Sequence, residues 1–170
     1  SKNYKKAIPF LENATNEQDA VAQNAYYQLG WCYLQTNQKD YATNCYQKAY
    51  QLNYDQQVKE LSLINYAKLS YETSKDPYSK AITDLESYIQ DHPDSEKLEE
   101  IQHFLIGIYG STKNYKQIII TTEKYRTKSP DIQRAYQRAC FFRGQEALND
   151  QEYKEAQVFF KKALQNPIDK

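Results

Sequence analysis

The sequence contains few of the residues that β-rich and disulfide-bonded folds require. Its 170 residues include only 4 Gly, 5 Pro and 3 Cys, and Val occurs only at Val21, Val58 and Val158. β-Sandwiches and barrels need β-branched strands joined by many turn residues, so an all-β fold is not expected. The cysteines are an odd number without metal-site spacing and therefore predict free thiols, with a Cys32–Cys45 bridge as the alternative.

The chain also lacks net charge and any long apolar run. It has 22 Lys and Arg against 22 Asp and Glu, which argues against the broad positive field of a general nucleic-acid binder. No stretch of about 18 apolar residues is present to span a membrane. Because there is no Met and no signal peptide, we expect a piece of a longer chain or a processed product. The 17 Tyr and 6 Phe nevertheless indicate a folded core, since disordered chains have few rings.

A pattern of large and small residues recurs along the chain. Its clearest copy consists of Tyr26, Leu29, Gly30 and Tyr33, followed by Ala42, Tyr46 and Ala49. Spacings of three and four residues within each group indicate two helices, and the polar stretch 35–39 indicates a turn between them. The crossing position of the second helix returns after 35 to 39 residues each time, at Ala7, Ala42, Ala81, Ile118 and Ala156. The sequence therefore predicts a series of helical hairpins.

This pattern resembles the tetratricopeptide repeat, in which an aromatic residue, Leu-Gly and Tyr precede Ala, an aromatic residue, Ala and a closing Pro. Pro93 and Pro130 stand at the closing position of two copies, and Tyr54 replaces Pro in a third. The resemblance implies an all-α, right-handed solenoid of about nine helices in antiparallel hairpins. It divides the chain into the second helix of a truncated repeat and four repeats, at residues 1–21, 22–55, 56–95, 96–132 and 133–170. We expect this single solenoid to be a fragment of a longer array.

Two segments suggest a narrower likeness. The stretches DHPDSE (91–96) and NYAKLSYETS (65–74) are similar to tetratricopeptide proteins of the Gram-negative cell envelope. The likeness implies a periplasmic or outer-membrane-associated location, with the cytoplasm as the alternative. No targeting signal in the sequence decides between them.

The family usually binds ligands in a groove lined by the first helix of each hairpin. The resemblance therefore implies a non-catalytic scaffold that binds a protein or peptide. The matching groove positions are Asn24, Tyr27, Trp31, Gln35, Lys68, Glu72, His103, Arg138, Phe141, Gln145 and Asn149. Tyr27 and Trp31 lie four residues apart and so share a helix face, away from the face that packs inside the hairpin. We expect a recognition surface there, since Trp and Tyr dominate binding hot spots; the alternative is that Trp31 belongs to the core.

Two other classes of function stay open. The aromatic surface or the open ends could pair two chains, which would make this a self-association module within a larger envelope protein. An enzyme on a helical-repeat fold is the remote alternative, because neither His92 nor His103 has ligand or nucleophile partners at a suitable spacing. We expect no catalytic residue, metal or cofactor. The expected partner is a protein or peptide rather than a nucleic acid, with homo-oligomer formation as the alternative.

Overall fold

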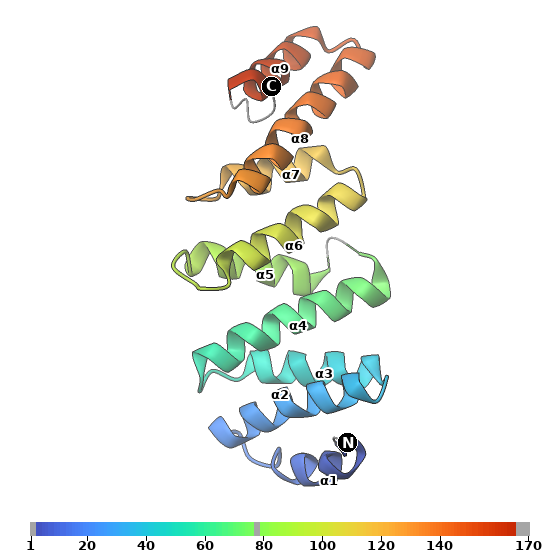
Figure 1. Cartoon of the computed structure of the whole chain (residues 1–170), viewed down its shortest axis with the longest axis vertical. Coiled ribbons are helices and arrows are strands. Elements are labelled where there is room, and N and C mark those ends of the chain that lie inside the picture. The colour runs from blue at the N-terminus through green and yellow to red at the C-terminus, as the bar shows by residue number, and fades with distance from the viewer. Residues whose placement is uncertain (1–2, 77–78, 166–170) are drawn as a thin grey trace. The chain divides into compact units, whose positions relative to one another are not determined.

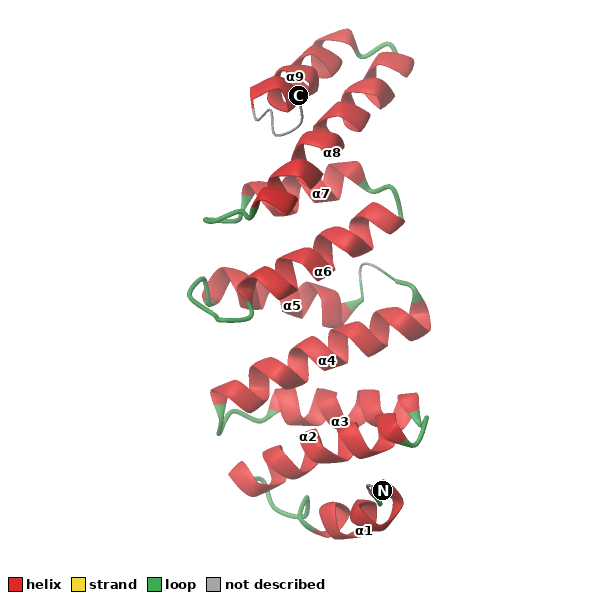
Figure 2. Cartoon of the chain, viewed as in Figure 1, coloured by secondary structure: helices red, strands yellow, loops and turns green. Residues whose placement is uncertain are grey.

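The computed structural model describes residues 3–76 and 79–165, and its regular elements are helices (Figures 1 and 2). These residues contain no β-strand and nine α-helices: α1 (Tyr4–Asn13), α2 (Ala20–Gln35), α3 (Lys39–Gln51), α4 (Gln56–Ser74), α5 (Lys80–Asp91), α6 (Leu98–Ser111), α7 (Tyr115–Glu123), α8 (Pro130–Asn149) and α9 (Tyr153–Gln165). The predicted all-α fold of consecutive hairpins is confirmed. Outside the described residues lie 1–2, 77–78 and 166–170, which belong to the predicted segments 1–21, 56–95 and 133–170.

The helices fall into two compact units. Unit 1 is Ser1–Leu85 and unit 2 is Glu86–Lys170, so the border lies within α5. In unit 1, α2 packs against α1 and α3, and α4 packs against α3 and α2. In unit 2, α7 packs against α6 and α8, α9 packs against α8, and α6 also contacts α8. Each unit is therefore built from helices that are close neighbours in sequence, as expected of helical repeats.

Side-chain caps fix where α2, α4 and α8 begin. At the start of α2, the Asp19 carboxylate accepts a hydrogen bond from the backbone N–H of Ala22 at 2.7 Å. Asp55 caps α4 in the same way and accepts two backbone N–H groups, at 2.9 and 3.1 Å. At α8, Ser129 is the cap and Pro130 occupies the first turn. These acceptors satisfy N–H groups that have no partner within the helix, and they set the register of the helices that carry most predicted groove residues.

Three hairpins, α2–α3, α6–α7 and α8–α9, leave their first helix through the same turn. One residue in each turn has a positive φ: 61° at Asn37, 54° at Lys113 and 63° at Gln151. The following N–H donates at 2.8 Å to a carbonyl in the last turn of the helix, in the pairs Gln38–Tyr33, Asn114–Tyr109 and Glu152–Ala147. This is the Schellman arrangement, which satisfies the terminal carbonyls and reverses the chain within a few residues.

Glycine lets the two helices of a hairpin approach closely. A Cβ atom added at Gly30 would lie 2.8 Å from the ring of Tyr46, and one added at Gly144 would lie 2.7 Å from the ring of Phe160. Both distances are far below the 3.5–4.0 Å or so at which carbon atoms attract one another. The ring of the second helix therefore occupies the space that any side chain on the first helix would need.

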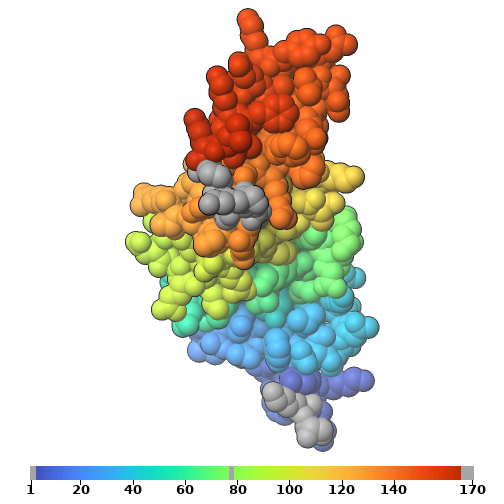
Figure 3. Space-filling view, turned by 45° about the horizontal axis from the view of Figure 1, so that its top comes forward, coloured from blue at the N-terminus to red at the C-terminus, as the bar shows by residue number. Residues whose placement is uncertain are grey.

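The core of unit 1 is aromatic. Tyr46, which is 1% exposed, packs with Ala42 of α3 and Leu69 of α4. Partly buried residues surround these three, namely Tyr27, Tyr33, Leu34 and Tyr66. In the space-filling view, side chains fill the spaces between α2, α3 and α4, drawn from blue to green (Figure 3).

A buried glutamine holds the α3–α4 link against α2. Gln23 is fully buried, and its Nε2 donates to the carbonyls of Ala49, Leu52 and Asp55 at 3.2, 3.0 and 3.1 Å. Its Oε1 accepts the N–H groups of Tyr54 and Asp55 at 3.1 and 2.7 Å. The two amide hydrogens are thus shared among three carbonyls and the amide oxygen accepts two N–H groups. These contacts tie the end of α3 and the α3–α4 link to α2, which positions the start of α4 relative to α2.

Candidate protein-binding surfaces

The predicted groove residues of unit 1 lie on α2 and α4, which are in contact and run side by side (Figure 1). On α2, Asn24, Trp31 and Gln35 are exposed. Trp31 is the one Trp of the chain and keeps 44% of its surface exposed. A ring of this size gains much free energy when it is buried, so Trp31 is suited to anchor a partner.

Tyr27 behaves differently from its expected companion Trp31. Its ring meets the ring of Tyr46 edge-on at a centroid distance of 5.8 Å, and it packs against the core of unit 1. The prediction that hairpin packing leaves this face free is therefore wrong for Tyr27. The cause is the open crossing at Gly30, through which Tyr46 reaches far enough toward α2 to contact the ring of Tyr27.

The two predicted residues on α4 are already engaged within the chain. Lys68 is half-buried, and the exposed Glu72 forms an ion pair with Lys39 of α3. The hydrogen bond and charge of the Lys39 ammonium hold the pKa of Glu72 below its usual value. Because both side chains of this pair face solvent, it adds little to stability.

The remaining predicted positions are in unit 2. His103 on α6 is exposed, with its Nε2 3.3 Å from the Ser129 hydroxyl and 3.7 Å from a Glu99 carboxylate oxygen. Gln145 and Asn149 are exposed on α8. These three residues supply polar surface, and the neighbours of His103 are a helix cap and one carboxylate.

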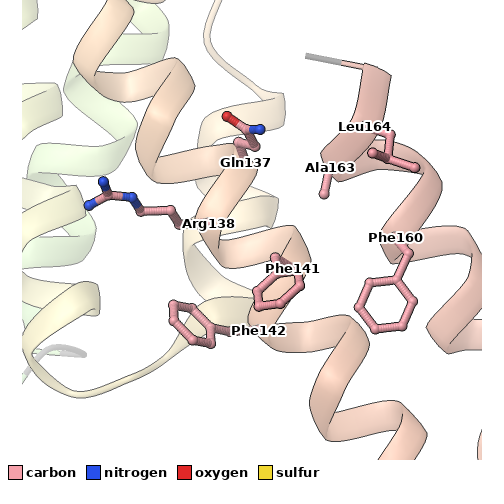
Figure 4. A pocket seen from close by; sticks show the side chains of 7 residues that line it. All are labelled: Gln137, Arg138, Phe141, Phe142, Phe160, Ala163 and Leu164. Carbon is pink, nitrogen blue, oxygen red and sulfur yellow. The ribbon is translucent and has the colours of Figure 1, made fainter. Parts of the chain in front are cut away.

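Arg138 and Phe141 line a pocket between α8 and α9 (Figure 4). This α8–α9 pocket has a volume of about 640 Å³, and its walls are Gln137, Arg138, Phe141, Phe142, Phe160, Ala163 and Leu164. Phe141, Phe142 and Leu164 keep 46%, 40% and 76% of their surface exposed. Arg138 is the one charged residue among these walls and points to the side of α8 away from α9. The pocket is therefore an apolar hollow with positive charge at one edge.

Ring contacts fix the three phenylalanines of the pocket. The Phe141 ring centroid lies 5.8 Å from that of Phe142 and 5.9 Å from that of Phe160. Phe142 stacks on Tyr115 of α7 at 4.9 Å. In Figure 4, Phe141 lies between the two helices, and Phe142 lies on the other side of α8. Rings held in this way lose little conformational freedom when a partner binds.

A second hollow adjoins the first. It has a volume of about 460 Å³ between α6, α7 and α8, and Arg138 and Phe142 border both hollows. Ile106 and Arg134 also line it, and Arg134 forms an ion pair with Asp131. Within unit 2, a hollowed surface thus continues along α8 from the α6 side to the α9 side.

Seven residues line the α8–α9 pocket, and only two of them, Arg138 and Phe141, are among the groove positions predicted from the family. Phe160 and Leu164 belong to a second helix, and such helices contribute no position to that groove. Phe142 directly follows Phe141, and neighbouring residues on a helix point in different directions. That adjacency is the signal in the sequence that at least one of the two rings lies outside the hairpin core.

The thiols of the chain are free but protected by burial. Cys32, Cys45 and Cys140 form no disulfide. Burial raises the pKa of Cys45 to about 11, and it also raises the pKa of Cys32 and of Cys140. Thiols that stay protonated at neutral pH are poor nucleophiles.

Residues 3–76 and 79–165 offer neither a metal-binding cluster nor a membrane-spanning helix. No three His, Cys, Asp or Glu side chains in these ranges are placed to hold a metal ion. None of the helices there combines the length and the apolar character that crossing a membrane requires.

Two segments of the chain match the model of a known family, and each segment contains one of the two glycine crossings. The model of the tetratricopeptide repeat matches residues 23–56 and 137–166. These two segments are similar to the tetratricopeptide repeat. The first contains the crossing of Gly30 and Tyr46, and the second contains that of Gly144 and Phe160 together with the walls of the α8–α9 pocket. No curated protein matches the chain, and the expected likeness to Gram-negative envelope proteins has no support from these comparisons.

Proposed function

We propose that the chain is a non-catalytic protein-binding module. The observation that carries the proposal is the α8–α9 pocket, in which exposed rings surround an apolar hollow within a tetratricopeptide repeat. Exposed apolar patches with a polar rim mark interaction sites on soluble domains. Helical repeats commonly use such extended surfaces to bind other proteins.

A second surface is proposed for unit 1. It consists of Trp31 with Asn24 and Gln35 on α2, beside Lys68 and Glu72 on α4. The exposed ring of Trp31 supports this assignment, since an aromatic anchor among amides and charges is typical of a binding hot spot. In unit 2, Gln145 and Asn149 on α8 and His103 on α6 are proposed as polar contacts of the bound partner.

The test is capture of partners from an extract of the source cells, with variants of the full chain. Phe141→Ser is expected to lower capture of at least one protein more than about tenfold, because loss of a hot-spot ring costs about 2 kcal/mol or more. Val158→Ser is the matched control, since Val158 is 51% exposed on α9 but is not a wall of the pocket. Trp31→Ala tests the surface of unit 1 separately. Equal capture by all four proteins, at equal melting temperatures, would contradict the proposal.

Self-association is the alternative function. Its support is the exposure of two bulky apolar side chains, Phe10 on α1 at 77% and Leu164 on α9 at 76%. Light scattering on a concentration series distinguishes the two functions. A dimer that Leu164→Ser dissociates would favour self-association, and a monomer at all concentrations would favour binding of a different protein.

A further inference from the structure

We infer that the groove between α1 and α3 of unit 1 binds an extended segment of a partner protein through an arginine of that segment. The arginine pairs with the Glu12 carboxylate and stacks on the exposed ring of Tyr41. This site is separate from the α8–α9 pocket and from the surface around Trp31, so it goes beyond the proposed function. Three carboxylates in similar places along the chain support it.

In each of these places, a glutamate on one helix accepts a hydrogen bond from a tyrosine hydroxyl on the next helix. The next helix in the chain packs in turn against the helix of the tyrosine, in the pairs α2 and α3, α6 and α7, and α8 and α9. The hydrogen-bonded pairs are Glu12–Tyr33 at 2.6 Å (α1 and α2), Glu86–Tyr109 at 2.9 Å (α5 and α6) and Glu123–Tyr136 at 2.9 Å (α7 and α8).

In unit 2, the helix after the tyrosine supplies the carboxylate with further donors. The Thr121 hydroxyl of α7 donates to Glu86 at 2.9 Å, and the Gln117 amide of α7 does so at 3.5 Å. The Lys162 ammonium of α9 donates to Glu123 at 2.7 Å. An ionised carboxylate has lone pairs for several donors and forms its strongest hydrogen bonds with cations.

The turns before α3 and α7 fix which of their positions are equivalent. Asn37 and Lys113 are the left-handed residues of these turns and lie 76 positions apart. The same interval separates Tyr33 from Tyr109, the two tyrosines that donate to the carboxylates. Equivalent positions on α3 and α7 therefore differ by 76.

At the positions of Gln117 and Thr121, α3 has Tyr41 and Cys45. The ring of Tyr41 stacks on another ring, and a thiol is a weak donor. Within residues 3–76 and 79–165, the bond from the Tyr33 hydroxyl is the one hydrogen bond or ion pair of the Glu12 carboxylate. Glu12 is thus left with acceptor capacity that Glu86 and Glu123 use inside the chain.

The space beside Glu12 is open. A groove of about 460 Å³ lies between α1, α2 and α3, and Glu12, Tyr33, Tyr41 and Cys45 are among the residues that line it. It adjoins a hollow of about 420 Å³, and Lys48 borders both. Each equivalent set of contacts in unit 2 comes from three consecutive helices, and all three counterparts are present here. This α1–α3 groove is therefore not an uncovered end of the helix series.

The walls of the α1–α3 groove favour a guanidinium group. Tyr41 is 60% exposed, and its ring stacks on that of Tyr33 at a centroid distance of 5.3 Å. Because the Tyr33 hydroxyl is bonded to Glu12, a planar cation can contact the ring of Tyr41 and donate to the carboxylate at once. Arginine does both, since it stacks on aromatic faces and presents five N–H donors in one plane, whereas lysine carries a compact charge.

Lys48 suggests a second feature of the partner. Its ammonium lies 5.2 Å from the ring centroid of Tyr26, and it follows Tyr41 by seven residues on α3, about 10 Å along the helix. A bound segment gains most if an acidic side chain meets Lys48 at about that distance from the arginine. In a polyproline II segment, side chains three residues apart lie on one side and about 9 Å apart. The fitting segment therefore has Arg and an acidic residue three positions apart.

The test uses a fluorescently labelled peptide of sequence Gly-Arg-Pro-Pro-Glu-Gly. It is titrated into the full chain, and binding is followed by fluorescence anisotropy. We expect saturable 1:1 binding that weakens as salt is added, because salt screens exposed charges. A peptide with Gln in place of Arg is expected to bind more than about tenfold more weakly. A peptide with Lys in that place should lie between the two, because it keeps the charge but not the planar donors.

Three variants of the chain locate the site. Glu12→Gln keeps an oxygen for the Tyr33 hydroxyl but removes the charge, and should weaken binding more than about tenfold. Glu86→Gln is the matched control and should leave binding unchanged, because that carboxylate is engaged within unit 2. Tyr41→Gln combined with Cys45→Thr copies the donors of α7 onto α3. This double variant should also weaken binding more than about tenfold, because Glu12 gains partners within the chain and the ring is lost.

Three results would overturn the inference: absence of binding, binding that Glu12→Gln leaves unchanged, and equal weakening by Glu12→Gln and Glu86→Gln, which would indicate attraction to charge alone. Glu12 is exposed, so Glu12→Gln should melt close to the unchanged chain. Phe141→Ser should leave peptide binding unchanged, since Phe141 lies in unit 2. Failure of this site and failure of the α8–α9 pocket to capture a partner are therefore distinguishable.

Discussion

Two glycines set the helix spacing in the two segments that match the tetratricopeptide repeat. At Gly30 and Gly144 the ring of the second helix fills the space of a missing side chain, so even a methyl group must displace Tyr46 or Phe160. We therefore predict that Gly30→Ala and Gly144→Ala each lower the free energy of unfolding by about 1–3 kcal/mol, the usual cost of overpacking. Urea denaturation of each variant measures the change.

The matched control for these variants is Gly107. It lies inside α6, and a Cβ added there meets nothing within 4 Å. Gly107→Ala should therefore raise the free energy of unfolding by about 0.5–1 kcal/mol, because Ala loses less backbone entropy than Gly in a helix. A loss of stability at Gly107 equal to that at Gly30 would show that helix crossing is not the cause.

Single residues also mark where sequence reasoning stops. Gly30 and its aromatic partner are predictable, because their spacing is a property of one hairpin. Tyr27 is not, because its burial depends on how far Tyr46 reaches across the crossing. The burial of Gln23 cannot be predicted either, since a polar residue is normally assigned to the surface. The backbone groups with which its side chain forms hydrogen bonds lie 26 to 32 positions away in the sequence.

At the scale of elements, helices and turns follow from local sequence, whereas the pocket does not. The polar stretch at 35–39 predicts the turn between α2 and α3, and Asn37 adopts the left-handed conformation there. The α8–α9 pocket depends on which helix covers a hairpin, and no pattern within the hairpin contains that information. Arg143 stands where the family has an apolar Leu, and its charge is balanced by an ion pair with Glu155 at 2.9 Å.

One carboxylate joins three helices of unit 2. Glu123 of α7 accepts hydrogen bonds from Lys162 of α9 at 2.7 Å and from the Tyr136 hydroxyl of α8 at 2.9 Å. The hydrogen bond from Lys162 is the main cause that holds the pKa of Glu123 below 4.5 in the folded chain. A carboxyl group with a lowered folded pKa adds stability above its unfolded pKa and loses it as the pH falls through the folded value.

We therefore predict a pH-dependent effect of Glu123→Gln. At pH 7 the variant should unfold with a free energy lower by at most about 1 kcal/mol, because the carboxylate is 44% exposed and solvent screens the pair. The difference should shrink as the pH falls below the ordinary glutamate pKa and vanish once the pH lies below the lowered pKa of Glu123 in the folded chain. Denaturation of both proteins at several pH values measures it. A difference that is constant with pH would mean that packing, not charge, joins the helices.

At the scale of the whole molecule, the contacts within each unit join helices that are close to one another in the sequence. The helices of unit 1 pack on their neighbours, and so do those of unit 2. In helical repeats of this kind, stability is close to a sum over repeats and the interfaces between neighbours. A local defect should therefore open its own unit first, because in such a sum each repeat is stabilised by its immediate neighbours.

Hydrogen exchange followed by mass spectrometry tests this expectation with the two glycine variants. Gly30→Ala should raise exchange in α2, α3 and α4, because α4 packs on the hairpin that the extra methyl group forces apart. It should leave α8 and α9 close to their rates in the unchanged chain. Gly144→Ala should give the opposite result, with faster exchange in α8 and α9 and little change in α2 and α3. The second variant is thus the control for the first, since both carry the same substitution at equivalent positions. Uniformly faster exchange in both units would contradict the prediction, because it would show that the chain opens as one cooperative body.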